Sequence, residues 1–322
     1  MKTFFTTLFV IFSLGFTAAQ GAPEGFPVTV VDTAGHELTV ESPPNMVVCL
    51  WNGCVSNMAY IGVMPDAVTE GVILGRHPAY FGEAFDDVIR IPVSENTPDI
   101  ETLLTLEPDL VVGDTDAYAL TKDFVPSYEQ NYVTDTLDLF LLDARNFARL
   151  FGKEAEVEAR LEQLLERAEA YGIASGRSKS IYIGLPDGED GSVWSINGGF
   201  VTCGFIQPIG QCSATFGDEW QEVSLEGLLA IDPDVLIVED HGVEYGEQMR
   251  VALSQLEGNA LWQELTAVQT NQVHIIERAV SRPVEPLVLE LWLDAVMPLA
   301  YPDVFPEPLT DKQVQEILSS EN

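Results

Sequence analysis

Two stretches of this chain repeat one fifteen-residue pattern. Asp99–Gly113 reads DIETLLTLEPDLVVG, and Ser224–Val238 reads SLEGLLAIDPDVLIV. In each copy a helix-starting Asp or Ser precedes about two amphipathic turns, an acidic-Pro-Asp turn stops the helix, and a β-branched run predicts a buried strand. Aligned without gaps, the copies share Glu101/Glu226, Leu103/Leu228, Leu104/Leu229, Pro108/Pro233 and Asp109/Asp234. The repeat therefore predicts two similar α/β lobes, each built around a mostly parallel sheet, with a ligand held between them.

The first residues have the layout of a secretory signal peptide. Lys2 is followed by an apolar run, Phe4–Phe16, and then by Thr17-Ala18-Ala19. The run is short for a membrane span, which needs about 18 residues or more, so we expect residues 1–19 to be cleaved. An uncleaved membrane anchor is the alternative. The first cysteine is Cys49, which predicts a soluble exported form with no lipid anchor and no stable membrane insertion.

The composition limits the classes of function. The chain has 322 residues, of which 46% are hydrophobic, and a formal net charge of −36. Its length suits two domains with packed cores. So acidic a surface repels nucleic acid, and we therefore do not expect DNA or RNA binding. Two interpretations of the acidity stay open: a solubility or salt-adapted surface, and a role in attracting cations.

Four cysteines in an exported chain predict disulfides. Three pairings are possible, and the local one joins Cys49 to Cys54 and Cys203 to Cys212. The second pair encloses a turn-rich segment. Cys49 lies in a predicted strand, where a buried thiol is the alternative.

Local patterns predict the remaining elements. Val28–Val40 alternates around a turn and predicts a hairpin, and Asn146–Tyr171 predicts a long amphipathic helix that ends at Gly172. The further expected elements are strands at Met46–Leu50, Ala67–Gly71 and Ser180–Leu185, and helices at Val55–Ile61 and Glu285–Leu299.

Several segments of the chain, taken together, resemble a known family of proteins. The segments that carry the resemblance are VTVVDTAGHELTVESPPNMVVCL at Val28–Leu50, both copies of the repeat, the long helix, NALWQELTAVQTNQVHII at Asn259–Ile276, and SRPVEP with LVLELWLDAVMPLAYPDVF near the end. Together they resemble the periplasmic substrate-binding proteins of ABC importers for ferric siderophores, haem and cobalamin.

The resemblance implies two Rossmann-like lobes joined by a single long connector helix. It divides the chain into an N-terminal α/β lobe at 26–145, a connector helix at 146–172, a C-terminal α/β lobe at 179–305 and a C-terminal tail at 306–322. It implies a monomer in the periplasm that captures an iron complex, most simply a ferric siderophore, and delivers it to the dimeric permease of an ABC transporter. Haem or cobalamin is the alternative cargo.

Family members dock on the permease through one surface glutamate per lobe, and the matching positions are Glu101 and Glu226. Both residues lie in the first turn of a short predicted helix, where a carboxylate is exposed. Complementing the helix dipole is the alternative role, which contributes about 0.3–1 kcal/mol each.

Ligands of open α/β sheets lie beyond the carboxyl ends of the strands. The candidate ligand-binding residues in the corresponding loops are Trp51, Arg76, His77, Tyr80, Trp194, His241, Arg278 and Arg282. The two tryptophans could enclose a flat chelate or complete the cores, and the arginines could hold an anionic group or pair with surface carboxylates. His36 and His274 are interpreted as structural. We expect no metal site of the protein's own and no cofactor beyond the chelate itself, because the histidines are scattered. Ligation of the cargo's metal by His77 and His241, directly or through the chelate, is the alternative.

Catalysis has little support. The chain contains no GxSxG, HExxH, Walker or GxGxxG motif, and we expect a binding protein rather than an enzyme. An exported chelatase or metal-cofactor handling enzyme on a related two-lobed fold is the alternative.

Overall fold

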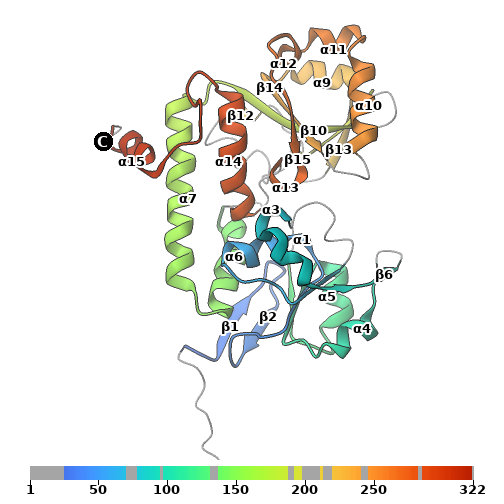
Figure 1. Ribbon diagram of the computed structural model, residues 1–322, viewed down its shortest axis with the longest axis vertical. Helices are drawn as coiled ribbons and strands as arrows, with labels where there is room; N and C mark the ends of the chain where they lie inside the picture. The colour runs from blue at the N-terminus through green and yellow to red at the C-terminus, as the bar shows by residue number, and fades with distance from the viewer. Residues whose placement is uncertain are drawn as a thin grey trace, which may run out of the picture.

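The computed structural model describes residues 25–69, 78–94, 97–130, 137–187, 192–197, 211–212, 220–240, 246–281 and 285–320. Two separate β-sheets divide these residues into an N-lobe and a C-lobe, with one long helix running alongside both (Figure 1). The predicted hairpin is confirmed: β1 (Val28–Val31) pairs antiparallel with β2 (Glu37–Val40).

The N-lobe sheet has five strands, and every pair in it is parallel. Its order is β5 (Ile89–Ile91), β4 (Ala67–Thr69), β3 (Val47–Cys49), β8 (Leu110–Gly113), β9 (Ser127–Glu129). All residues of β3, β4 and β8 are buried, as expected for strands covered on both faces. The lobe also contains α1 (Asn52–Tyr60), α3 (Pro78–Phe81), a 3₁₀ helix η1 (Gly82–Asp87), α4 (Ile100–Thr105), α5 (Thr115–Thr121) and the two-residue strands β6 (Val93–Ser94) and β7 (Thr97–Pro98).

The C-lobe sheet is mixed. Its order is β13 (Trp220–Ser224), β11 (Val193–Asn197), β10 (Ser180–Asp187), β14 (Val235–Asp240), β15 (Val273–Glu277), with β12 (Gln211–Cys212) also paired to β10. β12, β10, β14 and β15 run parallel, whereas β11 is antiparallel to its neighbours. The helices are α9 (Leu225–Ile231), α10 (Gly246–Leu256), α11 (Ala260–Glu264), α12 (Thr266–Gln269), α13 (Arg278–Ser281) and α14 (Pro286–Ala300).

The two copies of the repeat form the same unit. The side chain of Asp99 accepts a hydrogen bond from the amide of Thr102 and begins α4, and the Ser224 side chain accepts one from Gly227 and begins α9. Each helix leads into a buried parallel strand, β8 or β14. The prediction of two similar α/β units from the repeat is confirmed.

The acidic-Pro-Asp turns also match. Glu107 and Asp232 take left-handed backbone conformations, with φ of 48° and 44°, which end α4 and α9. The carboxylate of Asp109 then accepts the amide hydrogens of Asn45 (2.9 Å) and Met46 (3.1 Å), next to β3. Asp234 in the same way accepts the amide (2.7 Å) and hydroxyl (2.8 Å) of Ser180 at the start of β10. The repeated aspartate therefore ties each unit to the neighbouring strand.

The helix expected over Asn146–Tyr171 is two helices. α6 (Leu137–Leu150) ends before Gly152, whose φ is 65°, and α7 (Glu154–Ser175) begins after it. A left-handed glycine interrupts the helix without the steric cost that a Cβ atom would add. The single connector helix is α7 alone, which starts at Glu154 and extends to Ser175, past the expected end at Gly172.

The helix α14 joins the lobes. It packs against α1 and α6 of the N-lobe side and against α7. Arg160 of α7 donates to both oxygens of Glu290 in α14 (3.0 and 2.5 Å) and to the carbonyl oxygen of Tyr60 in α1 (2.6 Å). One buried apolar cluster runs from the N-lobe sheet through these helices to the C-lobe sheet. The lobes therefore share a core, which opposes large movements between them.

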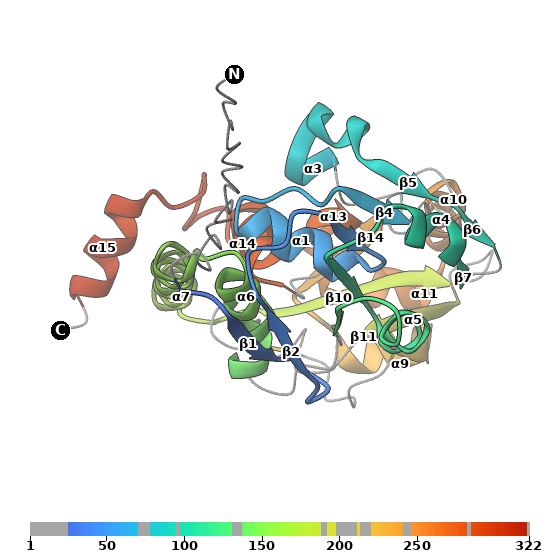
Figure 2. The same cartoon turned by 90° about the horizontal axis from the view of Figure 1, so that it is seen from below.

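The last residues form a further helix. α15 (Asp311–Ser320) packs against the outer face of α7 (Figure 2). The amide of Leu309 donates to the hydroxyl of Tyr171, and Arg167 contacts both Asp294 and Asp311. The expected C-terminal tail thus contains a helix attached to the connector.

Candidate functional site

The order of the N-lobe strands marks one point on the carboxyl edge of its sheet. From β3 the chain crosses to β4 on one side, and the later strand β8 lies on the other side. Ligands of open α/β sheets bind at such a switch point. The segments that leave β3 and β8 there lead into α1 and α5.

The C-lobe presents its own carboxyl edge to this region. α13, which follows β15, lies beside α1 in both views of the molecule (Figures 1 and 2). Glu239, near the end of β14, is buried and accepts a hydrogen bond from the Ser281 hydroxyl at the end of α13 (2.9 Å). The two carboxyl edges therefore flank the region between the lobes.

The first turn of α1 is held by a disulfide. Cys49 at the end of β3 is bonded to Cys54 in α1, with 5.6 Å between their Cα atoms, and both side chains are fully buried. Trp51 is the half-buried N-cap residue in extended conformation, and its own side chain does not cap the helix. The first turn holds no acidic residue. The disulfide expected between Cys49 and Cys54 is confirmed, whereas Cys203 lies outside the described residues, so its pairing with Cys212 stays a prediction.

The neighbouring α5 has a different amino-terminal end. The carboxylate of Asp114 accepts a hydrogen bond from the Ala117 amide (2.9 Å), and Asp116 lies in the first turn. This helix end is therefore closed to an external anion by the chain's own carboxylates.

Gln130 lies against the first turn of α1. Its side chain is 4% exposed and so close to Gly53 that a Cβ atom there would lie 2.6 Å from Nε2. Gln130 hydrogen-bonds the carboxyl group of Asp143, but its Oε1 atom has no hydrogen-bond partner among the described residues. A glycine at position 53 is what allows this approach.

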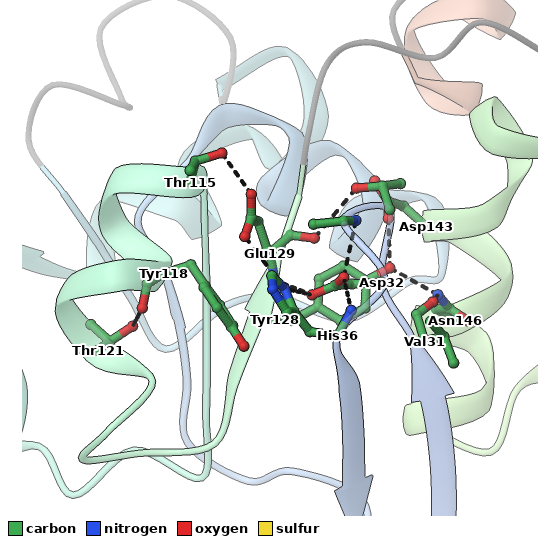
Figure 3. Close-up of polar contacts among 12 residues, drawn as sticks. Val31, Asp32, His36, Thr115, Tyr118, Thr121, Tyr128, Glu129, Asp143 and Asn146 are labelled. Carbon is green, nitrogen blue, oxygen red and sulfur yellow. Dashed lines mark hydrogen bonds and ion pairs between the residues drawn. The ribbon is translucent and has the colours of Figure 1, made fainter.

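A buried polar network that includes Asp143, Tyr128 and Asn146 leads toward the hairpin (Figure 3). The Tyr128 hydroxyl donates to Asp143 (2.6 Å) and accepts from Asn146, which also donates to the carbonyl oxygen of Val31 (2.7 Å). Burial, together with the nearby carboxylates of Glu285 and Asp32, raises the pKa of the Asp143 carboxyl to about 7, although the hydrogen bonds from Tyr128 and Gln130 act to lower it. Glu285, whose charge acts on Asp143, immediately precedes α14.

The second half of the network surrounds His36. Its Nδ1 atom lies 3.3 Å from Asp32 and 3.4 Å from Glu129, and its ring stacks on Tyr118 at 4.4 Å. Glu129 also accepts a hydrogen bond from Thr115 at the start of α5 (2.6 Å). The hairpin is thereby attached to the carboxyl end of β9, in keeping with the structural role expected for His36.

The structure locates four of the eight candidate ligand residues. Trp51 lies at the switch point, and Tyr80 in α3 is half-buried against the shared core. Arg278 begins α13 at the carboxyl end of β15. Trp194 is not a cleft residue: it is fully buried and stacks on Trp262 at 5.6 Å, because it points into the core between the C-lobe sheet and α11. Arg76, His77, His241 and Arg282 lie outside the described residues.

Both candidate docking glutamates are exposed in the first turns of α4 and α9. Its own amide and the Ser224 hydroxyl hold the pKa of the Glu226 carboxyl below its ordinary value. Figures 1 and 2 place α4 and α9 on the side of the molecule opposite α7. The two carboxylates could thus meet one partner surface.

The described residues offer neither a metal centre nor a membrane span. They contain no group of three or more His, Cys, Asp or Glu side chains placed to hold a metal ion. Within the same ranges, no helix is long and apolar enough to cross a membrane. Sequence reasoning missed Gln130 and Asp143, because nothing near either residue in the chain signals its contact with α1 or α14.

Comparison with known proteins extends these observations. The family model described as "Periplasmic binding protein" matches residues 92–279, more than half of the chain. The Fe(3+)-citrate-binding protein YfmC of Bacillus subtilis is 24% identical over 275 residues, which cover 80% of this chain and 81% of the relative. The putative ABC transporter substrate-binding lipoprotein YhfQ of the same organism is 25% identical over 272 residues, covering 76% and 80%.

A solved structure shares the fold. It is that of an ABC-type Fe3+-hydroxamate transport system from Saccharomonospora viridis, with a TM-score of 0.65, 21% identity, and coverage of 86% of this chain and 99% of that chain. Two lobes, a connecting helix and the matched family model lead to one conclusion. This chain belongs to the periplasmic binding protein family.

Proposed function

We propose that this protein is the substrate-binding component of an ABC importer and that its cargo is an iron chelate, most simply a ferric siderophore. The names of its relatives support this cargo, since YfmC is named for ferric citrate and the Saccharomonospora structure for an Fe3+-hydroxamate system. The cargo would bind between the carboxyl edges of the two sheets, near Trp51, and leave without chemical change. A dimeric permease would receive it from a monomeric binding protein.

The observation that carries the transport role is the paired display of Glu101 and Glu226. Two equivalent helices, one in each lobe, expose one carboxylate each on the side opposite α7. Such a pair matches a partner that presents two cationic groups, as a dimeric permease can do. The dipole contribution of about 0.3–1 kcal/mol per glutamate holds in either case.

The shared core supports a mechanism of capture with little closure. α7 and α14 are joined by Arg160–Glu290 and Arg167–Asp294, and the apolar cluster is continuous between the lobes. Binding would therefore rely on a preformed site rather than on a wide hinge movement. The leader at 1–19 and the absence of a lipid anchor remain proposals, because the leader lies outside the described residues and two of the relatives are named lipoproteins.

Charge reversal tests the docking role. The variant Glu101→Lys/Glu226→Lys should abolish uptake of a ferric siderophore by cells while its affinity for the same complex, measured by tryptophan quenching, changes less than twofold. The matched control is Glu154→Lys/Glu156→Lys, which reverses two exposed first-turn glutamates of α7 on the other side of the molecule. Uptake that survives the first variant, or is lost equally in the second, contradicts the assignment.

The cargo needs a separate measurement. Native mass spectrometry and the absorption spectrum of protein isolated from its own cells should show a ferric complex. A haem or cobalamin spectrum would identify that molecule as the cargo in place of a ferric siderophore, with the transport role unchanged. Chemical conversion of the bound complex by the purified protein would favour the chelatase alternative.

A further inference from the structure

Trp51 lies in a short loop that a disulfide closes. Cys49 ends β3 and Cys54 lies in the first turn of α1, so their bond encloses residues 50–53. Both bonded side chains are fully buried in the apolar cluster that runs through the two lobes, whereas Trp51 is half-buried at the switch point of the N-lobe sheet. The crosslink is therefore internal, and the residue that it brackets lies where the cargo is proposed to bind.

The chain around this loop is fixed at two separate points. On the strand side, the amide of Leu50 donates to the carbonyl oxygen of Val112 in β8 (2.8 Å). On the helix side, the buried side chains of Ser56 and Asn57 both donate to the carbonyl oxygen of Gly53 (3.0 Å each). The first bond joins the loop to the sheet, and the other two join it to α1. The disulfide connects the sheet and α1 directly.

α1 also belongs to the joint between the lobes. It packs against α14, α6 and α3 as well as against β3, and the carbonyl oxygen of Tyr60 at its end accepts a hydrogen bond from Arg160 of α7 (2.6 Å). A displacement of these helices would move α1 along the sheet and would carry Trp51 with it. The bond between Cys49 and Cys54 opposes this displacement, because it keeps their Cα atoms 5.6 Å apart.

The equivalent place in the C-lobe is held in another way. The repeated aspartate ties β10 to its unit through Asp234, as it ties β3 through Asp109. β10 continues into the antiparallel strand β11, and residues 180–197 contain no cysteine. Strand pairing therefore holds the chain there, whereas β3 ends after three residues and leads at once into α1. In the N-lobe the covalent bond takes the place of strand pairing beside Trp51.

We propose that the disulfide between Cys49 and Cys54 is a positioning element of the cargo site, which fixes Trp51 before the cargo arrives. A side chain that is already immobilised loses less entropy on binding, and one such side chain corresponds to about two- to tenfold in affinity. The bond thus acts on binding through Trp51, in addition to its effect on stability. This assignment rests on the proposed binding of an iron chelate near Trp51 and adds to it a buried residue pair that does not touch the cargo.

The test compares variants of the exported protein. Cys49→Ala/Cys54→Ala removes the crosslink. Cys49→Val/Cys54→Ala also removes it but restores part of the lost volume, so a binding defect common to both variants reports the missing bond rather than a cavity. The matched control is Leu161→Ala, which truncates a buried side chain of α7 in the same apolar cluster and leaves the loop intact.

Each protein is titrated calorimetrically with ferrichrome, ferric enterobactin and ferric citrate, and a complex that wild type binds serves as the probe. Both crosslink-free variants should bind the probe at least about threefold more weakly than wild type, whereas Leu161→Ala should bind it within about twofold. A loss smaller than threefold in either crosslink-free variant, or an equal loss in Leu161→Ala, overturns the proposal.

A double-mutant cycle tests whether the bond acts through Trp51. Trp51→Ala should itself weaken binding of the probe. Removing the disulfide from Trp51→Ala should weaken binding no further, because the side chain that the bond positions is then absent. A purely structural role would instead give losses that add, and additive losses overturn the proposal.

A further readout needs no cargo. Wild type labelled with fluorotryptophan should give one narrow fluorine NMR signal for Trp51, assigned by its disappearance in Trp51→Phe. The signal should broaden or split in Cys49→Ala/Cys54→Ala, while that of the fully buried Trp194 stays unchanged. An unchanged Trp51 signal overturns the proposal. Wild type that binds none of the three complexes, but shows the change in the Trp51 signal, contradicts the iron-chelate cargo and not the positioning role.

Discussion

Truncation of Arg160 should loosen the joint between the lobes. In the variant Arg160→Ala, α7 loses two hydrogen bonds to Glu290 in α14, one to the carbonyl oxygen of Tyr60 in α1, and the stacking of the guanidinium 4.1 Å above the Tyr60 ring. These contacts join three helices, so their loss affects both lobes.

The magnitude follows from the exposure of the groups. The side chains of Arg160 and Glu290 are 36% and 26% exposed, so the ion pair contributes about 1 kcal/mol rather than the value of a buried pair. The bond to the Tyr60 carbonyl adds about 1 kcal/mol and the stacking about 0.5–1 kcal/mol. The free energy of unfolding should therefore fall by about 2.5–3 kcal/mol.

Urea denaturation followed by tryptophan fluorescence measures this change. The control is Arg145→Ala, which removes a similar two-bond pair with Glu158 that is 36% and 45% exposed and stays within α6 and α7. It should cost about 1 kcal/mol or less. A double-mutant cycle of Arg160→Ala with Glu290→Ala should give a coupling energy of about 1 kcal/mol. A loss below about 0.5 kcal/mol in Arg160→Ala, or zero coupling, would refute the reasoning.

Three further outcomes are expected. The raised pKa of Asp143 means that the folded state binds the proton more tightly than the unfolded state, so stability should fall as the pH rises from 3.8 to about 7; Asp143→Asn should flatten that slope in denaturation curves, and an unchanged slope would contradict it. Trp194→Ala should lower the free energy of unfolding by about 3–5 kcal/mol, because it removes the packing on Trp262, and it should not weaken ligand binding by the folded protein. A loss of ligand affinity without a loss of stability would show that Trp194 contacts the ligand after all. Replacing Cys49 and Cys54 by serine should cost about 2 kcal/mol, the loop-closure value for a sequence separation of 5, measured as a shift of the denaturation midpoint against wild type under non-reducing conditions; no shift would indicate that the bond does not constrain the unfolded chain.

The repeated phrase allowed much of the fold to be predicted. Caps, turns and buried strands depend on residues a few positions apart, so the pattern at Asp99–Gly113 could be interpreted without a structure. The same locality explains the errors. The apolar periodicity of α6 continues into α7, which hid the break at Gly152. The strand pattern around Trp194 does not show whether its side chain faces the cleft or the core.

The candidate site could be predicted only to the level of its loops. The strand-end rule identified Trp51, but its place at the switch point became visible only when β3, β4 and β8 were placed in one sheet. Gln130 and Gly53 are far apart in the chain and carry no motif. Their contact depends on how β9 and α1 pack.

The sequence by itself determined that the chain contains two similar α/β units, where their helices are capped, and that each unit exposes a glutamate. These features depend on short-range hydrogen bonds and apolar periodicity. The tertiary structure alone decided that the lobes share one core, that Trp194 is buried and that Gln130 lies against the first turn of α1. Periodicity shows which face of an element is apolar, but not which partner covers it. That choice is made by packing between residues distant in the chain.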